Sequence, residues 1–226
     1  ENETSLVGEF PLKDALIDAD VQFFPEGGDL LAGVAKKVAF KAVGADGKGL
    51  RVKGKVVDSK KSVITEFADL GLGMGYFTLL PNVGEQYKAV IQLPNGQEKV
   101  FDLPQAKSEG INVVIGKISK EAIQIGLVAG DEYFKTIQNE PYYIFGQMNG
   151  HLIYGAQATM KNAALNLTVP VKDIPNGIIQ FTLISPQGKA ISERLVFYNH
   201  AENLQIGVQS DKSSYKQKEA VKLSLT

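Results

Sequence analysis

Apolar and polar residues alternate with a period of two along most of this chain, and this alternation limits the fold more than any other feature. Lys37–Val43 and Arg51–Val57 both show it clearly. A strand with this pattern turns its apolar side chains to one face, whereas a helix needs a repeat of about 3.6 residues. Residues 45–49 favour a turn between the two stretches, so we predict a hairpin here and an all-β chain overall.

Similar short runs continue along the rest of the sequence. Asn95-Gly96 and Asn149-Gly150 are tight-turn pairs and predict two further hairpins. The segment 131–139 does not alternate, and we expect a short helical turn or a loop there. The other predicted strands recur at roughly the 8 to 12 residue spacing of a β-sandwich. They cover 63–67, 76–80, 87–93, 98–101, 112–117, 122–128, 141–146, 151–154, 164–169, 178–184 and 192–198.

The length of 226 residues suits two domains of roughly 100 residues each. Pro104 and Gly110 enclose a polar stretch that is typical of a linker. An internal echo agrees with this division, because Phe-Thr-Leu at Phe77 recurs at Phe181 and a Pro/Gly turn follows each copy. We predict an N-terminal extension at 1–17, a first β-sandwich at 18–104, a linker at 105–110, a second β-sandwich at 111–203 and the first strands of a third domain at 204–226.

Six residues lie on the apolar phase of their predicted strands, and we expect all of them to be buried in the two cores. They are Phe40, Val56, Phe77, Phe181, Leu183 and Val196.

The last segment, 204–226, has two strand-like runs at 205–208 and 221–225 with turn residues at 211–214 between them. Two strands cannot bury a core, and an isolated hairpin is marginal in water. We therefore expect the natural protein to continue. We also expect this segment to pack on the second domain or to pair with another chain, as a strand-edge homodimer through 204–226 would do.

Composition excludes several classes of function. A net charge of −1 and only two arginines, Arg51 and Arg194, argue against a nucleic-acid partner. No apolar run approaches the roughly 20 residues that span a bilayer, so we expect no transmembrane segment in this stretch. The absence of cysteine excludes disulfides, thiolate zinc sites and a thiol nucleophile.

Three stretches together resemble the macroglobulin-type β-sandwich arrays of large bacterial cell-envelope proteins. They are 20–30 (DVQFFPEGGDL), 193–197 (ERLVF) and 211–221 (DKSSYKQKEAV). The third resembles the start of a macroglobulin domain, in which Asp-Lys, a tyrosine and a glutamate precede an apolar strand. It departs from that pattern at Lys216-Gln217-Lys218, where the family commonly has a Pro-Gly turn.

The resemblance implies tandem immunoglobulin-like (macroglobulin-type) antiparallel β-sandwiches, which is an architecture rather than a chemistry. It also implies an extracytoplasmic protein of the Bacteroidetes type, periplasmic or outer-membrane associated. Such a protein could also contain a linked TonB-dependent receptor or plug domain. The thioester with which some macroglobulins trap proteases needs a cysteine, so the resemblance does not support protease inhibition here.

Pro25-Glu26-Gly27-Gly28 is the most distinctive local segment and our candidate docking loop. Its two glycines permit positive φ angles, which favours a shaped turn between strands with Glu26 in solvent or accepting backbone donors. Loops at the end of a sandwich are common binding sites, so a docking role is the second interpretation.

We assign no catalytic, cofactor-binding or metal-ligating residues. His151 and His200 lie beside turn sequences and lack the spacing that marks a catalytic base. The glycine-rich run 70–75 precedes a strand rather than a helix, so it does not predict a nucleotide loop. The densest aromatic group favours core packing over a sugar-stacking platform. It comprises Tyr133, Phe134, Tyr142, Tyr143 and Tyr154.

These observations favour a non-catalytic structural or interaction module of a larger bacterial cell-envelope protein, without cofactors. Its partners would be other domains of the same polypeptide or other envelope proteins. The alternative is a glycan- or peptide-binding module that uses end loops or an exposed strand edge.

Overall fold

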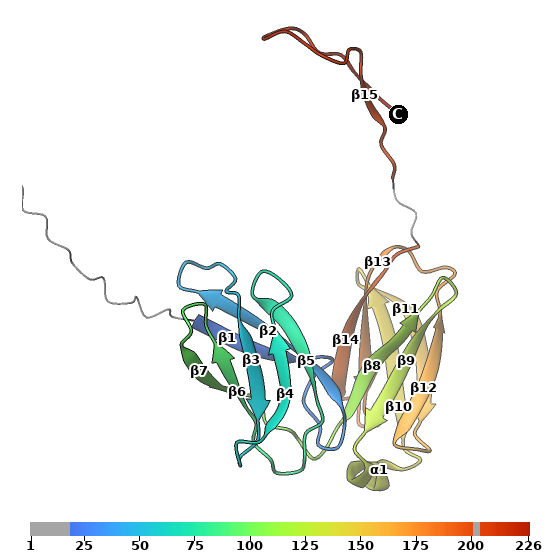
Figure 1. Cartoon of the computed structure of the whole chain (residues 1–226). Coiled ribbons are helices and arrows are strands. Elements are labelled where there is room, and N and C mark those ends of the chain that lie inside the picture. Colours follow the sequence, from blue (N-terminus) through green and yellow to red (C-terminus); the bar gives the residue numbers. More distant parts are fainter. Residues whose placement is uncertain (1–18, 201–203) are drawn as a thin grey trace, which may run out of the picture.

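The computed structural model describes residues 19–200 and 204–226 (Figure 1). The described residues form antiparallel sheets and one short helix. The all-β prediction is therefore confirmed.

The first sandwich contains seven strands in two sheets. The three-stranded sheet has the order β1-β2-β5, and the four-stranded sheet has the order β4-β3-β6-β7. Both sheets are antiparallel throughout. The strands are β1 (Ala19–Pro25), β2 (Lys36–Gly44), β3 (Lys53–Val57), β4 (Val63–Ala68), β5 (Met74–Leu79), β6 (Lys88–Gln92) and β7 (Glu98–Asp102).

The second sandwich repeats this arrangement. Its sheets have the orders β12-β9-β8 and β11-β10-β13-β14, again antiparallel. The strands are β8 (Ile111–Ile118), β9 (Ala122–Ala129), β10 (Pro141–Met148), β11 (His151–Thr159), β12 (Ala164–Pro170), β13 (Gly177–Ile184) and β14 (Ala190–Tyr198). In both sandwiches the first, second and fifth strands make one sheet, and the fourth, third, sixth and seventh make the other. This order defines two immunoglobulin-like β-sandwiches.

The shared strand order shows that the Phe-Thr-Leu match at Phe77 and Phe181 does not mark equivalent positions of the two sandwiches. Phe77 lies in β5, the fifth strand of its sandwich, whereas Phe181 lies in β13, the sixth strand of the other. Equivalent strands start closer together: β3 begins at Lys53 and β10 at Pro141, which is 141 − 53 = 88 residues later. The Phe-Thr-Leu match therefore joins strands that are not equivalent, although the two units do repeat.

Each sandwich has its own apolar core between its sheets, built from the alternating phase of its strands. In β2 every second residue from Lys36 to Ala42 is buried. The rings of Phe40, Phe67 and Phe77 pack on one another with centroids 4.9 and 5.0 Å apart, a distance that favours aromatic pairs. All six residues expected in the cores are buried, so this prediction is confirmed.

The predicted hairpin of β2 and β3 is wrong. The turn itself forms, with Gly44 N donating to Lys48 O at 2.9 Å, but β2 pairs with β1 and β5 while β3 pairs with β4 and β6. Val52 is buried where the chain crosses from one sheet to the other. Alternation specifies which face of a strand is buried, but it does not specify which strand lies beside it. The hairpins at Asn95-Gly96 and Asn149-Gly150 are confirmed.

Two further segments complete the sandwiches. The helix α1 (Asp131–Ile137) forms where a helical turn or a loop was expected, and it buries Ile137. The prediction missed β1 as a strand, although Val21 and Phe23 on its apolar phase contact the first core. The predicted extension at 1–17 lies outside the described residues.

The segment 204–226 forms a small hairpin of β15 (Val208–Ser210) and β16 (Leu223–Leu225). β16 lies within the predicted run 221–225, whereas β15 overlaps the predicted run 205–208 only at Val208. Figure 1 shows the hairpin apart from the sheets of the second sandwich. Its apolar side chains are more than half exposed, as Leu204 at 87% and Leu225 at 69% illustrate. Packing on the second domain, one of the two expected arrangements, is not seen.

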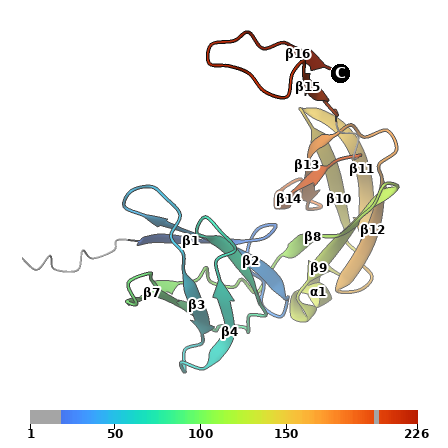
Figure 2. The same ribbon diagram turned by 45° about the horizontal axis from the view of Figure 1, so that its top comes forward.

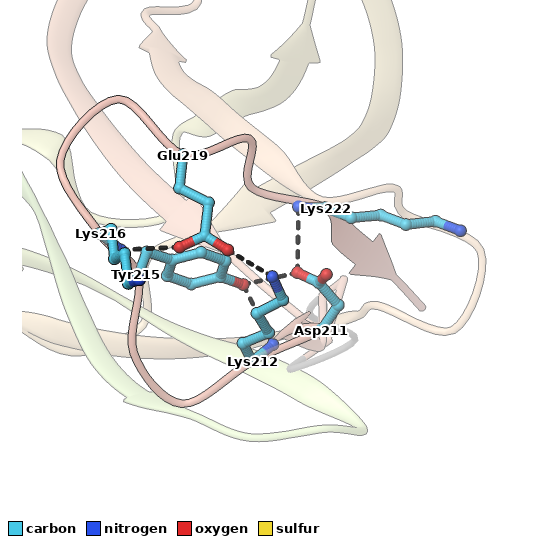
Figure 3. A network of polar contacts seen from close by, with 6 residues as sticks. All are labelled: Asp211, Lys212, Tyr215, Lys216, Glu219 and Lys222. Carbon is cyan, nitrogen blue, oxygen red and sulfur yellow. Dashed lines mark hydrogen bonds and ion pairs between the residues drawn. The ribbon is translucent and has the colours of Figure 1, made fainter.

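The residues that carried the family resemblance here form one polar network (Figure 3). The Asp211 carboxylate accepts hydrogen bonds from Tyr215 Oη at 2.6 Å and from Lys222 N at 3.1 Å. These hydrogen bonds lower the pKa of Asp211. Glu219 binds Lys212 and also accepts from Lys216 N at 2.7 Å. The Asp-Lys, tyrosine and glutamate pattern thus closes the long turn between the strands.

Candidate functional site

The β1–β2 loop, residues 26–35, joins the two sandwiches. Glu26 forms a half-buried ion pair with Arg194 of β14. Ser192 Oγ donates to Gly27 O at 2.8 Å and accepts from Val113 N at 3.1 Å. The contacts of Glu26 and Gly27 link residues that are more than 160 positions apart in the sequence. The loop therefore fastens the first sandwich to the β8 and β14 side of the second.

Gly27 is required by this geometry. Its φ is +76°, in the left-handed region that favours glycine. A Cβ atom on Gly27 would lie 2.7 Å from Val113 O, which is closer than real Cβ contacts allow. The sequence therefore has glycine at this position for two independent reasons.

The loop also pairs with the linker. Ala32 N donates to Lys107 O at 2.9 Å, and Lys107 N donates to Leu30 O at 2.8 Å. Lys107 Nζ lies 2.6 Å from Asp29 Oδ2. Leu31 is buried and lies against Gly110, where an added Cβ would come within 2.8 Å of its side chain. The linker is thus held along the first sandwich rather than free between the domains.

The contacts of the β1–β2 loop and Lys36 with the linker and the second sandwich form the interdomain joint. Lys36 is a buried charge within it. Its Nζ donates to Asp29 O at 2.6 Å and to Asn112 Oδ1, in the second sandwich, at 2.8 Å. Burial lowers the pKa of Lys36 to about 8, although the nearby carboxylates of Asp29 and Glu26 oppose the shift. Burial outweighs both carboxylates, as expected for an amine removed from water.

The candidate docking loop lies in this joint. Pro25 ends β1, and Gly28 is exposed with a φ of +114°. The Glu26 carboxylate binds the Arg194 guanidinium, which corrects the expectation that it would lie in solvent or accept backbone donors. Binding of an outside partner by Pro25, Glu26, Gly27 and Gly28 stays a prediction.

Sequence reasoning missed Lys36, Arg194, Ser192 and Asn112 as members of the joint. One signal was present: Lys36 lies on the same phase as Val38 and Phe40, so the alternation already placed a lysine where apolar side chains are buried. A charge on a buried phase indicates a specific partner. The partner itself lies across a domain boundary and left no local pattern.

Neither histidine belongs to a catalytic arrangement in the described residues. His151 is exposed at the start of β11. His200 is half buried, and its Nε2 lies 2.6 Å from Ile174 O while its backbone N donates to Asn176 Oδ1 at 2.7 Å. His200 thus anchors the end of β14. That neither histidine is needed for any activity stays a prediction.

The glycine-rich run 70–75 forms a turn at the start of β5, and the aromatic group packs mainly on the second core. The run leads directly into β5, and Gly73 O accepts from Ala42 N at 2.8 Å. Tyr142 is buried and Tyr143 is 36% exposed, so the adjacent tyrosines face opposite sides of β10. The other three aromatic residues, Tyr133, Phe134 and Tyr154, are partly buried against the second core.

The outer face of the β4-β3-β6-β7 sheet carries a shallow hollow of about 630 Å³. Lys53, Lys55, Glu66 and Glu98 line it, so its charges are mixed. Phe67 is the one aromatic residue among its lining residues, and it is buried. The hollow therefore lacks an exposed ring on which a sugar could stack.

No group of three or more His, Cys, Asp and Glu side chains that could hold a metal ion occurs within 19–200 and 204–226. In the same residues, no helix is long and apolar enough to cross a membrane.

The fold and the joint define the class: a tandem immunoglobulin-like β-sandwich chain with a polar interdomain joint. No family model matches the sequence, and no curated protein matches it. Among solved structures, the chain is similar to the BSP domain of a biofilm-associated protein, with a TM-score of 0.36 and 14% identity over 80% of this chain and 30% of that one.

The chain is also similar to two other solved structures. One is a two-domain fibronectin type III segment of chicken tenascin, with a TM-score of 0.30 and 12% identity over 79% of this chain and 100% of that one. The other is the native conformation of E. coli alpha-2-macroglobulin, with a TM-score of 0.29 and 15% identity over 90% of this chain and 16% of that one. The fold class rests on the strand order described above, not on these similarities.

Proposed function

We propose that the chain is a rigid, non-catalytic spacing module of a larger cell-envelope protein. The joint carries this proposal. Free tandem domains usually connect through an exposed, flexible linker with few contacts across the boundary. Here the linker is paired with the β1–β2 loop, and Lys36, Glu26 and Gly27 all contact the second sandwich.

The kinds of contact matter more than their number. An exposed ion pair contributes little, typically below about 1 kcal/mol. Glu26 and Arg194 are only about one-third and one-quarter exposed, and the hydrogen bonds of Gly27 O and Asn112 Oδ1 are directional. Such a set fixes the orientation of the two domains. A fixed orientation is what a spacing module needs to hold neighbouring domains at a set distance and angle.

Spin-label distance measurements test the rigidity. The sequence contains no cysteine, so cysteines at the exposed Lys60 and Lys161 would be the only labelling sites. We expect a single narrow distance distribution between the two labels. Arg194→Ala should broaden it, because Glu26 loses its partner. Arg51→Ala is the matched control, since it removes the other arginine outside the joint, and it should leave the width unchanged. A broad distribution in the parent protein would refute the rigid spacer.

The wider setting in this proposal is extracytoplasmic, in the periplasm or at the outer membrane of a bacterium of the Bacteroidetes type. A TonB-dependent receptor or plug domain in the same polypeptide would be one neighbour for such a spacer. Protease accessibility of the tagged protein in intact and permeabilised cells tests the location. The extracytoplasmic location would be contradicted if the protease cleaved the protein neither in intact nor in permeabilised cells, and only after the cytoplasm was lysed.

The second candidate is a peptide-binding module, and the hollow on the β4-β3-β6-β7 sheet is the observation that favours it. Its lysine side chains on β3 and glutamate side chains on β4 and β7 suit an extended peptide of mixed charge better than a glycan. Binding of a mixed-charge peptide library, lost in Lys55→Glu and kept in Lys48→Glu, would support this function. Equal binding to both variants would exclude the hollow as the peptide-binding site.

A further inference from the structure

The edge strand β11 is long, open and uncharged. It pairs with β10 on one side, and no strand among the described residues pairs with its other side. Its nine residues, HLIYGAQAT, include no Asp, Glu, Lys, Arg or Pro. An edge of this kind exposes a row of unpaired backbone N–H and C=O groups, which is a template for another strand.

Most other edge strands of the two sandwiches carry a charge or a proline, which normally discourages such pairing, although β5 (MGYFTL) carries neither. The edge strands β4, β7 and β14 contain Glu66, Glu98 and Glu193 respectively. β1 contains Asp20 and ends at Pro25. β12, the edge of the other sheet beside β11, is uncharged but ends at Pro170. In Figures 1 and 2, β11 and β12 lie on the side of the second sandwich that faces away from the first.

We propose that this edge binds a second copy of the chain, by antiparallel pairing of β11 with β11 of its partner. A two-fold axis perpendicular to the sheet pairs one residue of β11 with its own counterpart. Ile153 is bulged, because Tyr154 pairs with Gly146 and Leu152 with Gln147 in the ladder to β10. The regular part of β11 is therefore Tyr154–Thr159. Centring the axis on Ala156 keeps the pairs next to it within that part.

A second copy is the occupant we propose, because β11 is compatible with its own symmetric copy. Self-pairing repeats each side chain across the axis, and like charges directly opposite each other destabilise a strand pair. In the register centred on Ala156, Gly155 lies opposite Gln157 of the second copy, and Tyr154 lies opposite Ala158. No pair brings like charges together. The result is a continuous sheet that runs through both copies.

A pair of double variants tests this surface. Gly155→Lys with Gln157→Lys places lysine opposite lysine in both symmetric pairs. Gly155→Lys with Gln157→Glu places lysine opposite glutamate at the same positions. Both residues are exposed, and a Cβ on Gly155 would lie 3.6 Å from the Phe145 ring, an ordinary contact. Both variants should therefore fold.

The measurement is the dimerisation constant of the full chain by analytical ultracentrifugation, as its mass rises from 24.5 kDa toward twice that value with concentration. We expect the Lys/Lys variant to dimerise about tenfold or more weakly than the Lys/Glu variant. Hydrogen exchange on the unmodified chain gives an independent reading: amides of 154–158 should become protected as concentration rises.

Three outcomes would overturn the proposal. The unmodified chain could remain monomeric at every concentration. The two variants could dimerise equally well, which would assign dimerisation to another surface such as the hairpin at 204–226. The amides of 154–158 could show no concentration-dependent protection.

Discussion

Lys36 gives the joint a pH dependence that can be worked out from its surroundings. Its side chain is buried, and its pKa is lowered from 10.5 to about 8, first by burial and further by the charge of Arg194. The Asp29 and Glu26 carboxylates offset part of this shift. The perturbation is Lys36→Met, which keeps an unbranched chain of similar length and removes the titrating group.

The sign follows from proton counting. Below pH 8, Lys36 is protonated in both the folded and the unfolded chain, so the cost of burying its charge is present in full. Between pH 8 and 10.5 the unfolded chain holds more protons than the folded one, so the free energy of unfolding rises with pH. A shift of about 2.5 pKa units corresponds to roughly 3 kcal/mol. The variant lacks this contribution.

The assay is urea unfolding of both proteins between pH 7 and 10.5, followed by far-ultraviolet circular dichroism because the tyrosines ionise in this range. We expect the difference in unfolding free energy, parent minus Lys36→Met, to increase by about 3 kcal/mol across the range. Groups common to both proteins cancel in the difference. A constant difference would show that Lys36 is solvated in the folded chain, and a falling one would show that its ion pairs outweigh its burial.

The remaining predictions concern the core and the loop. Phe181→Ala should lower the free energy of unfolding by roughly 3 to 5 kcal/mol, because the ring is fully buried; a loss below about 1 kcal/mol would place it on the wrong face. Gly27→Ala should destabilise the chain by about 1 to 3 kcal/mol more than Gly47→Ala. Both glycines have φ near +75°, but an added Cβ meets Val113 O only at Gly27, so equal losses in calorimetry would contradict the close approach.

The sequence predicted most strands because the signal for a strand is local. In β2, β9 and β10, the alternation itself marks the buried face, and the structure buries that face. Turn pairs such as Asn149-Gly150 also predicted their hairpins, since two positive φ angles in succession suit few other sequences. Local patterns therefore recovered the elements and their orientation.

Strand partners and the joint could not be predicted in the same way. The turn at 45–49 forms as expected, yet β3 pairs in the other sheet, and Val52 is buried where the chain crosses between the sheets. Glu26 and Arg194 form an ion pair between the two sandwiches, 168 positions apart in the sequence, so no local pattern marks it. In the hairpin at 204–226, the polar network of Asp211, Tyr215 and Glu219 was not predicted, and Lys218 takes a φ of +62°.

The two sides of the second sandwich differ in a way that unites the two proposals. On the side of β8 and β14, Ser192 binds Gly27 and Arg194 binds Glu26, so these two side chains already have partners within the chain. On the opposite side, β11 and β12 carry no charge that would repel a strand. A spacer with one side fixed to its own neighbour and the other open can join two chains without disturbing its joint. The Lys/Lys variant of β11 should therefore weaken dimerisation while leaving the width of the spin-label distribution unchanged, and a change in both would mean that the two sides are coupled through the core.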